Sequence, residues 1–305
     1  MTPPRIILTI TACALLGAGC SYPEERVTRS TQPVTSVWAQ SASTTTTSFI
    51  DADVFAIQEL MAAAAQPLPE EAVFVCKKYR AGIVNHHALA SDLLAAFFRT
   101  LKRCRPDVKT VIILSPDHFG QASAAVTTHR LPYRVSGRDI EVDEHSADRL
   151  KGAVTSHQEQ ASLFTREHGI GALLPFLTDS VPDARIVPVI IRSQIDEVSR
   201  AEVSAWLKNE LKNPATFVVI SSDMSHYLAA DIAWRKQAED NRALQNSDVD
   251  FFIAAKDDHT DNGESIAAVL RALGKTKWTL LRESISSDYA GSPGFTTTYA
   301  IGFWD

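Results

Sequence analysis

Hydrophobic and polar positions divide the chain into three parts. Residues 6–16 form an unbroken run of apolar and small residues, whereas residues 21 to about 50 are polar and show little periodic hydrophobicity. Past Ile50, short apolar runs alternate with amphipathic stretches. This alternation predicts an α/β fold, with a central, largely parallel or mixed β-sheet and helices on both faces.

The individual elements can be placed by residue number. Apolar runs predict strands at 81–86, 110–114, 122–128, 138–142, 185–192, 216–221, 278–282 and 296–304. Helical patterns predict helices at 51–64, 88–104, 168–177, 197–211, 231–255 and 264–273. Thr165 is the expected N-cap of the helix at 168–177.

The N-terminus has the features of a lipoprotein signal peptide. Arg5 supplies a positive charge, and the apolar run from Ile6 to Leu16 is too short to span a bilayer. Small residues then precede Cys20, so we expect cleavage before Cys20 and lipidation of that residue. Leu16 lies one place farther from the cysteine than is usual, and plain secretion or an uncleaved anchor are the alternatives.

Residues 21–50 are rich in Ser and Thr and cannot bury enough apolar surface to offset the entropy of ordering them. They are predicted to form a flexible tether, and residues 51–305 a single α/β domain. The expected location is therefore outside the cytoplasm, as a membrane-anchored lipoprotein that faces the periplasm or the cell exterior.

Composition narrows the range of functions. Lys and Arg number 30 against 36 for Asp and Glu, and no basic stripe is present, which argues against a nucleic-acid partner. Of the four cysteines, Cys13 belongs to the signal peptide and Cys20 would carry lipid. Cys76 and Cys104 either form a disulfide in an oxidising compartment or stay as two buried thiols, and their spacing fits no metal motif.

Histidines occur at the ends of three predicted strands, in the segments His86-His87, Asp117-His118 and Asp223 to His226. Ligands collect at the carboxyl ends of strands in open α/β sheets, so these histidines predict a shared metal or acid/base site. Two imidazoles with one oxygen ligand and open positions are typical of non-haem Fe(II). Zinc with the same ligands and a water is the competing interpretation.

Other residues have weaker signals. Glu167 and His168 begin a predicted helix and are expected to face the same cleft. The alternative for Glu167 is a structural role, in which its negative charge complements the helix N-terminus. The sequence has no Gly-rich phosphate loop and no Gly-x-Ser-x-Gly motif, although serines beside Asp223 leave hydrolysis open. Four further histidines lie in polar, loop-like or surface stretches and are predicted to have no role in the site: His129, His145, His157 and His259.

Taken in order, these segments resemble the MEMO family, called AmmeMemoRadiSam system protein B in prokaryotes. The segment 82–86 corresponds to the family's Pro-His-Ala-Gly strand end, with Asn85 in place of proline, and 115–118 to its Gly-Pro-x-His. The segment 167–176 corresponds to its Glu-His-Ser and Leu-Pro-Phe element, and 221–226 to its Ser-Ser-Asp-x-x-His. The resemblance extends from about Ala81 to Phe303.

The resemblance implies a fold similar to class III extradiol dioxygenases, in which two histidines and a carboxylate hold Fe(II). It assigns His86 and His118 as metal ligands and His226 as the acid/base residue, with Asp223 beside it. MEMO relatives have a cysteine before a glycine at the start of a late helix, and here Asn262 takes that place. The two alternatives for the third ligand are Asp261 and Glu264, and loss of metal binding is a further outcome.

The function implied is that of an exported metal-binding protein with redox or dioxygenase-like activity on an unknown small molecule. The expected cofactor is a divalent metal, with iron favoured over zinc and copper. One alternative is a catalytically inactive module that binds a peptide or another ligand in the same cleft. The other is a metal-dependent hydrolase with His226 or Glu167 as its base.

Overall fold

A computed structural model describes residues 49–290 and 292–305. The predicted signal peptide, Cys20 and nearly all of the tether lie outside these residues. Among the described residues, no helix has the length and apolar character that crossing a membrane requires.

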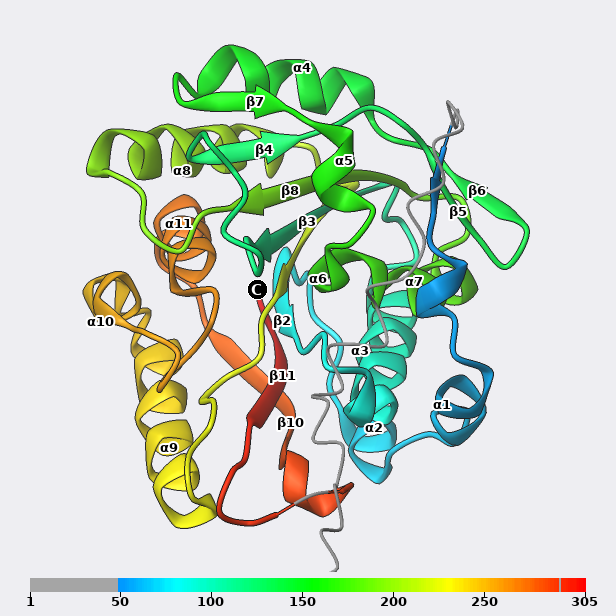
Figure 1. The fold of residues 1–305 in the computed structure, drawn as a ribbon, viewed down its shortest axis with the longest axis vertical. Helices are drawn as coiled ribbons and strands as arrows, with labels where there is room; N and C mark the ends of the chain where they lie inside the picture. Colours follow the sequence, from blue (N-terminus) through cyan, green and yellow to red (C-terminus); the bar gives the residue numbers. More distant parts are fainter. Residues whose placement is uncertain (1–48, 291) are drawn as a thin grey trace, which may run out of the picture. The chain divides into compact units, whose positions relative to one another are not determined.

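An eight-stranded mixed sheet with the order β10-β11-β2-β9-β3-β8-β4-β7 forms the centre of the domain (Figure 1). Its strands are β2 (Ala81–Val84), β3 (Thr110–Pro116), β4 (Val126–Thr128), β7 (His157–Glu159), β8 (Arg185–Ile191), β9 (Thr216–Ser221), β10 (Trp278–Ile285) and β11 (Thr298–Trp304). A second, three-stranded sheet contains β1 (Ile50–Asp51), β5 (Tyr133–Val135) and β6 (Arg138–Ile140).

The middle of the large sheet is parallel, because β2 pairs with β9, β9 with β3, and β3 with β8 in the same direction. In this register Val84 lies opposite Ser221, and Leu114 lies opposite Ile220. The carboxyl ends of β2, β9 and β3 therefore lie side by side at one edge of the sheet.

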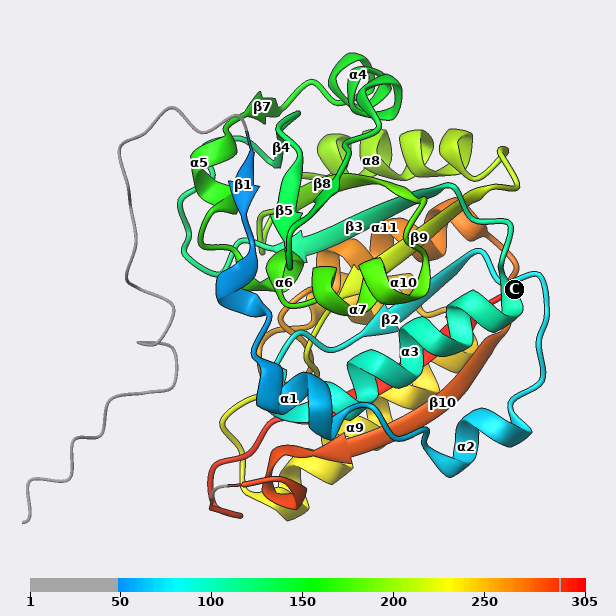
Figure 2. The same ribbon diagram turned by 90° about the vertical axis from the view of Figure 1, so that its right-hand side faces the viewer.

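Helices cover both faces of this sheet, as predicted, and Figure 2 shows α1, α3 and α7 on the opposite side from α8, α9 and α11. Helices α2 and α6 belong with α1, α3 and α7. The bounds of these five helices are α1 (Gln58–Ala63), α2 (Pro69–Val73), α3 (Ser91–Cys104), α6 (His168–Gly171) and α7 (Leu174–Ser180). The other helices are α4 (Glu144–Ala153), α5 (Ala161–Phe164), α8 (Glu197–Glu210), α9 (Ala230–Asn246), α10 (Val249–Ala254) and α11 (Gly263–Leu273). Short 3-10 turns lie at Asp53–Phe55, Ala88–Ala90 and Ser286–Asp288.

Close packing of α3 against the sheet depends on a glycine. The Phe97 ring stacks on Phe303 of β11 with ring centroids 4.6 Å apart. A Cβ at Gly82 of β2 would lie 2.7 Å from the Phe97 ring and 2.6 Å from the Gly302 carbonyl oxygen. A larger residue at position 82 would therefore force α3 away from the sheet.

Most predicted elements are present, but three predicted helices are interrupted. The stretch 231–255 is two helices, because Ser247 adopts a left-handed conformation (φ 55°) and Asp248 caps α10. The stretch 168–177 is also two helices, α6 and α7, and Glu167 rather than Thr165 is the N-cap. The stretch 51–64 begins as the end of a strand and a 3-10 turn, so only α1 within it is α-helical. Strands β1, β5 and β7 and helices α2, α4 and α5 were not predicted.

His129 lies in the loop directly after β4, as one of the predicted possibilities had it, but it is not at the surface. Its side chain is buried, its Nε2 lies 3.1 Å from the Tyr133 hydroxyl, and its ring packs against Phe164. Burial lowers the pKa of His129 to about 3. His129 is therefore a neutral core residue.

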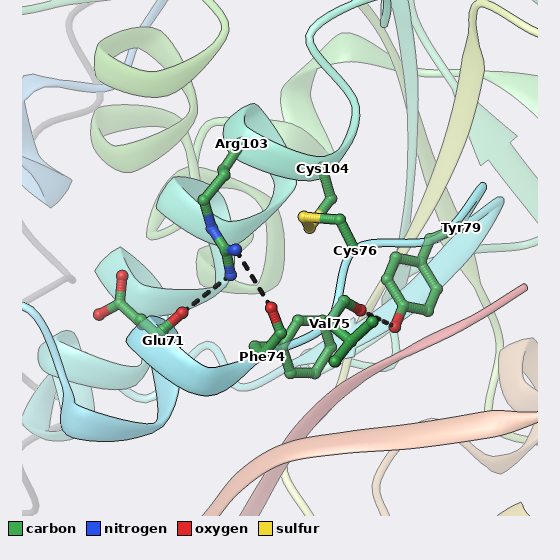
Figure 3. Close-up of a disulfide and its surroundings, with 7 residues drawn as sticks. All are labelled: Glu71, Phe74, Val75, Cys76, Tyr79, Arg103 and Cys104. Carbon is green, nitrogen blue, oxygen red and sulfur yellow. Dashed lines mark hydrogen bonds between the residues drawn. A yellow bond between two sulfur atoms is a disulfide. The ribbon is translucent and has the colours of Figure 1, made fainter.

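A disulfide joins Cys76, in the segment before β2, to Cys104 at the end of α3 (Figure 3). This decides between the two alternatives that the sequence left open. Neighbouring bonds reinforce the same connection, because the Arg103 guanidinium donates to the carbonyl oxygens of Glu71 and Phe74. The disulfide thus fixes α3 to the chain that leads into β2.

We predict that replacing both cysteines, Cys76→Ser with Cys104→Ser, lowers the free energy of unfolding by about 2–4 kcal/mol. The cross-link restricts the unfolded chain over a sequence separation of 28 residues, and its removal restores that entropy. Urea unfolding with and without dithiothreitol measures the effect. Dithiothreitol should destabilise the native protein and leave the double variant unchanged; equal stability of both oxidised proteins would contradict the prediction.

Candidate metal centre

The three parallel strand ends bring the predicted residues together. His86 and His118 each follow their strand by two residues, after β2 and β3, and Asp223 follows β9 in the same way. The Nε2 atoms of His86 and His118 lie 3.0 Å apart, and their rings meet edge to face. This confirms that the two segments, 32 residues apart in sequence, converge at the edge of the sheet.

Helix α6 adds a third histidine to this pair. The His168 ring lies 3.9 Å from the His118 ring and 5.2 Å from the His86 ring, measured between centroids. One nitrogen atom from each of the three histidines lies within 4.8 Å of the other two. We call His86, His118 and His168 the histidine cluster; together they could hold a metal ion.

Asp261 supplies an oxygen beside the histidine cluster. Its Oδ2 lies 3.1 Å from His86 Nε2, 3.6 Å from His118 Nε2 and 3.9 Å from His226 Nε2. This oxygen is buried, yet it forms no hydrogen bond with any described residue. Ligands about 2.0–2.2 Å from one metal ion lie roughly 3.0–3.5 Å apart. His86, His118 and Asp261 therefore point at a common position, and the donor set fits a divalent ion.

Glu167 holds His118 in the orientation that this site needs. The carboxylate is buried, and its Oε1 lies 2.5 Å from His118 Nδ1 while accepting a hydrogen bond from the Gly169 amide. With Nδ1 bonded to Glu167, Nε2 of His118 faces the cluster. A carboxylate behind a metal-binding histidine fixes the ring and raises its basicity.

The pKa values of the histidines show which proton a metal ion would have to displace. Burial lowers the pKa of His118, but the Glu167 and Asp261 carboxylates outweigh it and raise the pKa to about 10. Burial and the neighbouring imidazoles lower the pKa of His168 to about 2. Without an ion, His118 is therefore protonated on both ring nitrogens at neutral pH, and a metal that binds through its Nε2 must displace the proton on that atom.

Position 169 is closed to side chains. A Cβ on Gly169 would lie 2.2 Å from the Ser115 Oγ and 3.2 Å from both the His118 ring and the Glu167 carboxylate. Glycine at this position lets α6 begin directly against the end of β3. This close approach brings His168 and the capping Glu167 to His118.

Asp223 shapes the backbone around the cluster. Its Oδ1 accepts hydrogen bonds from the backbone amides of His86 and His87, at 3.1 and 3.4 Å. Its Oδ2 lies 3.8 Å from His86 Nε2 and 4.0 Å from His226 Nε2. The predicted partners Asp223 and His226 are therefore neighbours without a hydrogen bond, and His226 Nδ1 is buried without a partner among the described residues.

Asn262 has a different environment from that of a metal ligand. Its amide nitrogen donates to the carbonyl oxygens of Leu114 and Ser221, at 3.1 and 2.8 Å. These bonds tie the ends of β3 and β9 to the start of α11. Of the three oxygen ligands considered from the sequence, Asp261 is therefore the one whose carboxylate lies among the histidines.

Glu264 and Asp117 make bonds that support the fold. Both carboxylate oxygens of Glu264 accept hydrogen bonds from Arg200, at 2.7 and 3.0 Å, in a buried ion pair between α11 and α8. Asp117 accepts from the backbone amides of Gln121 and Ala122 and so closes the loop after β3. Among the described residues, no hydrogen bond or ion pair joins either carboxylate to the histidine cluster.

The loop at residues 256–262 positions Asp261. Thr260 Oγ1 lies 2.6 Å from Ser222 Oγ, and the His226 amide donates to the Asp257 carbonyl oxygen. His259 Nδ1 lies 2.6 Å from Asp240 Oδ1 on α9. His259, predicted to lie in a polar or surface stretch, is thus partly buried and attaches this loop to the helix.

One residue near the site carries no signal in the sequence. Tyr299 lies on β11 among fully buried residues, and its hydroxyl lies 2.7 Å from His87 Nδ1. A buried tyrosine usually bonds its hydroxyl to a partner. The partner, 212 residues away in the sequence, could be found only from the fold.

Comparison with known proteins agrees with this geometry. Residues 53–302 match the model of the family described as Memo-like protein. The chain belongs to this family. The resemblance predicted from the motifs is thereby confirmed, and so is the Memo-like mixed α/β fold.

Relatives of this Memo family member include archaeal and bacterial proteins. A MEMO1 family protein from Caldivirga maquilingensis is 28% identical over 205 residues, which span 64% of this chain and 72% of the relative. Another from Thermotoga petrophila is 24% identical over 216 residues, 69% of this chain and 77% of the relative. The crystal structure of an uncharacterised Escherichia coli K12 protein superposes with a TM-score of 0.51 at 14% identity, covering 72% of this chain and 99% of that one. This last similarity concerns the fold alone.

We predict that Glu167→Gln in this Memo family member weakens metal affinity about 10–100-fold. The amide keeps the shape of the side chain but removes the charge that supports His118. Competition with a chelating dye during titration with Fe(II) or Zn(II) measures the affinity. Glu144→Gln, at an exposed position on α4, is the control and should bind like the native protein; equal affinities of all three proteins would refute the role of Glu167.

Proposed function

We propose that this chain is an exported, metal-dependent member of the Memo family, of the AmmeMemoRadiSam system protein B type, with redox or dioxygenase-like activity on a small molecule. The observation that carries the proposal is the convergence of His86 Nε2, His118 Nε2 and Asp261 Oδ2, with His168 beside them. The donor set supports iron over zinc and copper, because two imidazoles and one carboxylate are typical of non-haem Fe(II) sites. A bound Fe(II) would supply the capacity for electron transfer and oxygen chemistry.

The protein's own residues have separable tasks in this proposal. Glu167 fixes the tautomer and orientation of His118, and Asp223 holds the backbone of His86. His226 is the acid/base residue, because its Nε2 faces the Asp223 and Asp261 carboxylates while its Nδ1 is free of protein partners among the described residues. A proton can therefore be held at His226 within 4.0 Å of the site's carboxylates.

Zinc-dependent hydrolysis is the second candidate, and the three-histidine cluster favours it. Three histidines with an open fourth position are a known arrangement of catalytic zinc, in which the metal lowers the pKa of bound water. In that case His226 would serve as the general base. A binding module without chemistry is the remaining alternative, and it requires no metal.

We predict that the full-length protein, supplemented with iron or zinc, carries about one metal ion per chain. His86→Ala, His118→Ala and Asp261→Asn should each abolish stoichiometric binding, because each removes a converging donor. Elemental analysis by mass spectrometry measures the content, and X-ray absorption at the iron and zinc edges identifies the ion. His145→Ala, at an exposed position, is the control.

Absence of stoichiometric metal after supplementation would overturn the enzyme proposal and favour the binding module. Asn262→Ser should retain metal if the protein folds, because Asn262 bonds to backbone carbonyls of the strand ends. Ester or amide hydrolysis that continues under strict anaerobiosis would favour zinc hydrolysis over oxygen chemistry.

The proposed location outside the cytoplasm has support independent of the N-terminal sequence. The Cys76–Cys104 disulfide suits an oxidising compartment, where structural disulfides persist. A thiolate ligand would be prone to oxidation there, whereas the carboxylate of Asp261 is not. Outside the cytoplasm, the proposed partners are a small molecule or peptide in the cleft and the membrane through the lipid on Cys20.

We predict that Cys20→Ala releases the protein from the membrane fraction, because the acyl chains on Cys20 provide the anchor. Fractionation and labelling with a fatty-acid analogue measure the effect. Cys13→Ala, within the predicted signal peptide, is the control and should stay lipidated and membrane-bound. Unchanged labelling of Cys20→Ala would contradict the lipoprotein assignment.

A further inference from the structure

The second histidine of the His86-His87 pair is oriented by a buried tyrosine. Nδ1 of His87 lies 2.7 Å from the Tyr299 hydroxyl, and the two rings meet edge to face. Tyr299 is fully buried on β11. The backbone of His87 is also held, since its amide donates to Asp223 Oδ1.

Hydrogen-bond satisfaction decides which nitrogen of His87 carries a proton. Among the described residues, the Tyr299 hydroxyl has no partner other than His87 Nδ1. If Nδ1 carried the proton, the buried hydroxyl would have no acceptor for its own, at a cost of about 1–3 kcal/mol. The hydroxyl therefore donates to Nδ1, and the proton of the neutral ring is on Nε2.

The other side of the ring is free to bind a ligand. His87 is partly exposed, and its Nε2 has no hydrogen-bond partner among the described residues. His87 lies beside the metal centre, because it directly follows His86 and its amide donates to Asp223, whose Oδ2 lies 3.8 Å from His86 Nε2. His87 thus adds an unused N–H donor beside the metal centre.

We propose that His87 is a ligand-binding residue that donates a hydrogen bond from Nε2 to an anionic oxygen of the substrate, with Tyr299 as its positioning residue. The proposal rests on the metal-dependent function above and adds a substrate class to it. An imidazole N–H cannot bind a cation but pairs well with a carboxylate, phenolate or enolate oxygen. The substrate would therefore carry such an oxygen close to the ion.

The tautomer can be tested without any metal. Nitrogen chemical shifts of histidine-labelled, metal-free full-length protein distinguish a protonated from an unprotonated Nδ1, and the His87→Ala variant assigns the signal. We expect Nδ1 to be unprotonated and Nε2 to carry the proton, and Tyr299→Phe to produce a mixture of both tautomers. A protonated Nδ1 in the native protein would overturn the proposal.

Ligand binding can be tested with Co(II)-loaded protein and sodium azide as the anionic probe, followed by visible absorption. His87→Ala should bind Co(II) with unchanged affinity and azide about 10-fold more weakly, because one hydrogen bond to the anion is lost. Tyr299→Phe should lower the affinity for azide about 3-fold, because only a fraction of the molecules keeps the tautomer in which Nε2 donates. Tyr133→Phe, which removes another buried hydroxyl bonded to a histidine, is the matched control and should bind azide normally.

The outcomes separate this proposal from the function on which it rests. Failure of the native protein to bind Co(II) overturns the metal-dependent function, while the tautomer measurement still reports on Tyr299 and His87. Normal Co(II) binding with azide affinity unchanged in His87→Ala overturns the role of His87 alone. A loss of Co(II) affinity in His87→Ala also overturns it, because His87 would then be a metal ligand.

Discussion

Parallel pairing of β2, β9 and β3 is the constraint on which the site depends. Each strand delivers a functional residue two positions past its end, and the shared direction of the strands places all three ends at one edge. Asn262 strengthens this edge by bonding to the carbonyl oxygens of β3 and β9 together. The site is thus a consequence of strand register, and a slip of one residue would turn its side chains to the wrong face.

The edge concentrates more ionisable groups than a protein interior normally accepts. Three imidazoles lie together, with the Asp261 carboxylate beside His86 and His118 and the buried Glu167 beside His118 and His168. Burying charges is favourable only when they are paired or bound to a metal. Glu167 pairs with His118, but Asp261 Oδ2 has no hydrogen bond among the described residues. A divalent ion would satisfy that oxygen and the neighbouring nitrogens in one step, which explains physically why the arrangement suits a metal.

The disulfide and the choice of oxygen ligand are consistent with one environment. An oxidising compartment preserves the link between Cys76 and Cys104 and would damage a thiolate in an open metal site. Asn262, at the place where the family resemblance implies a cysteine, bonds to the strand ends, and Asp261 beside it faces the histidines. Asn262 thus supports the strand ends, and the adjacent Asp261 provides the oxygen that faces the histidine cluster.

The amino-acid sequence alone determined the α/β architecture, the family and the convergence of His86 and His118. These follow from local patterns: continuous apolar strands, amphipathic helices, and motifs directly after strand ends. The sequence also placed Asp261 and His168 near the cleft, but it could not choose between Asp261, Asn262 and Glu264. All three carry a side-chain oxygen near the start of one helix, and the sequence does not show the direction in which each side chain points.

Tertiary structure made that choice, because Arg200 engages Glu264, strand carbonyls engage Asn262, and only Asp261 reaches the imidazoles. It also decided the pairing of Cys76 with Cys104, the burial of His129 and the contact of His87 with Tyr299. Each of these depends on packing between segments far apart in the chain, for which a single sequence has no local signal. Hydrophobic periodicity therefore specified the layers of this protein, and the packing of those layers specified the partners of its polar side chains.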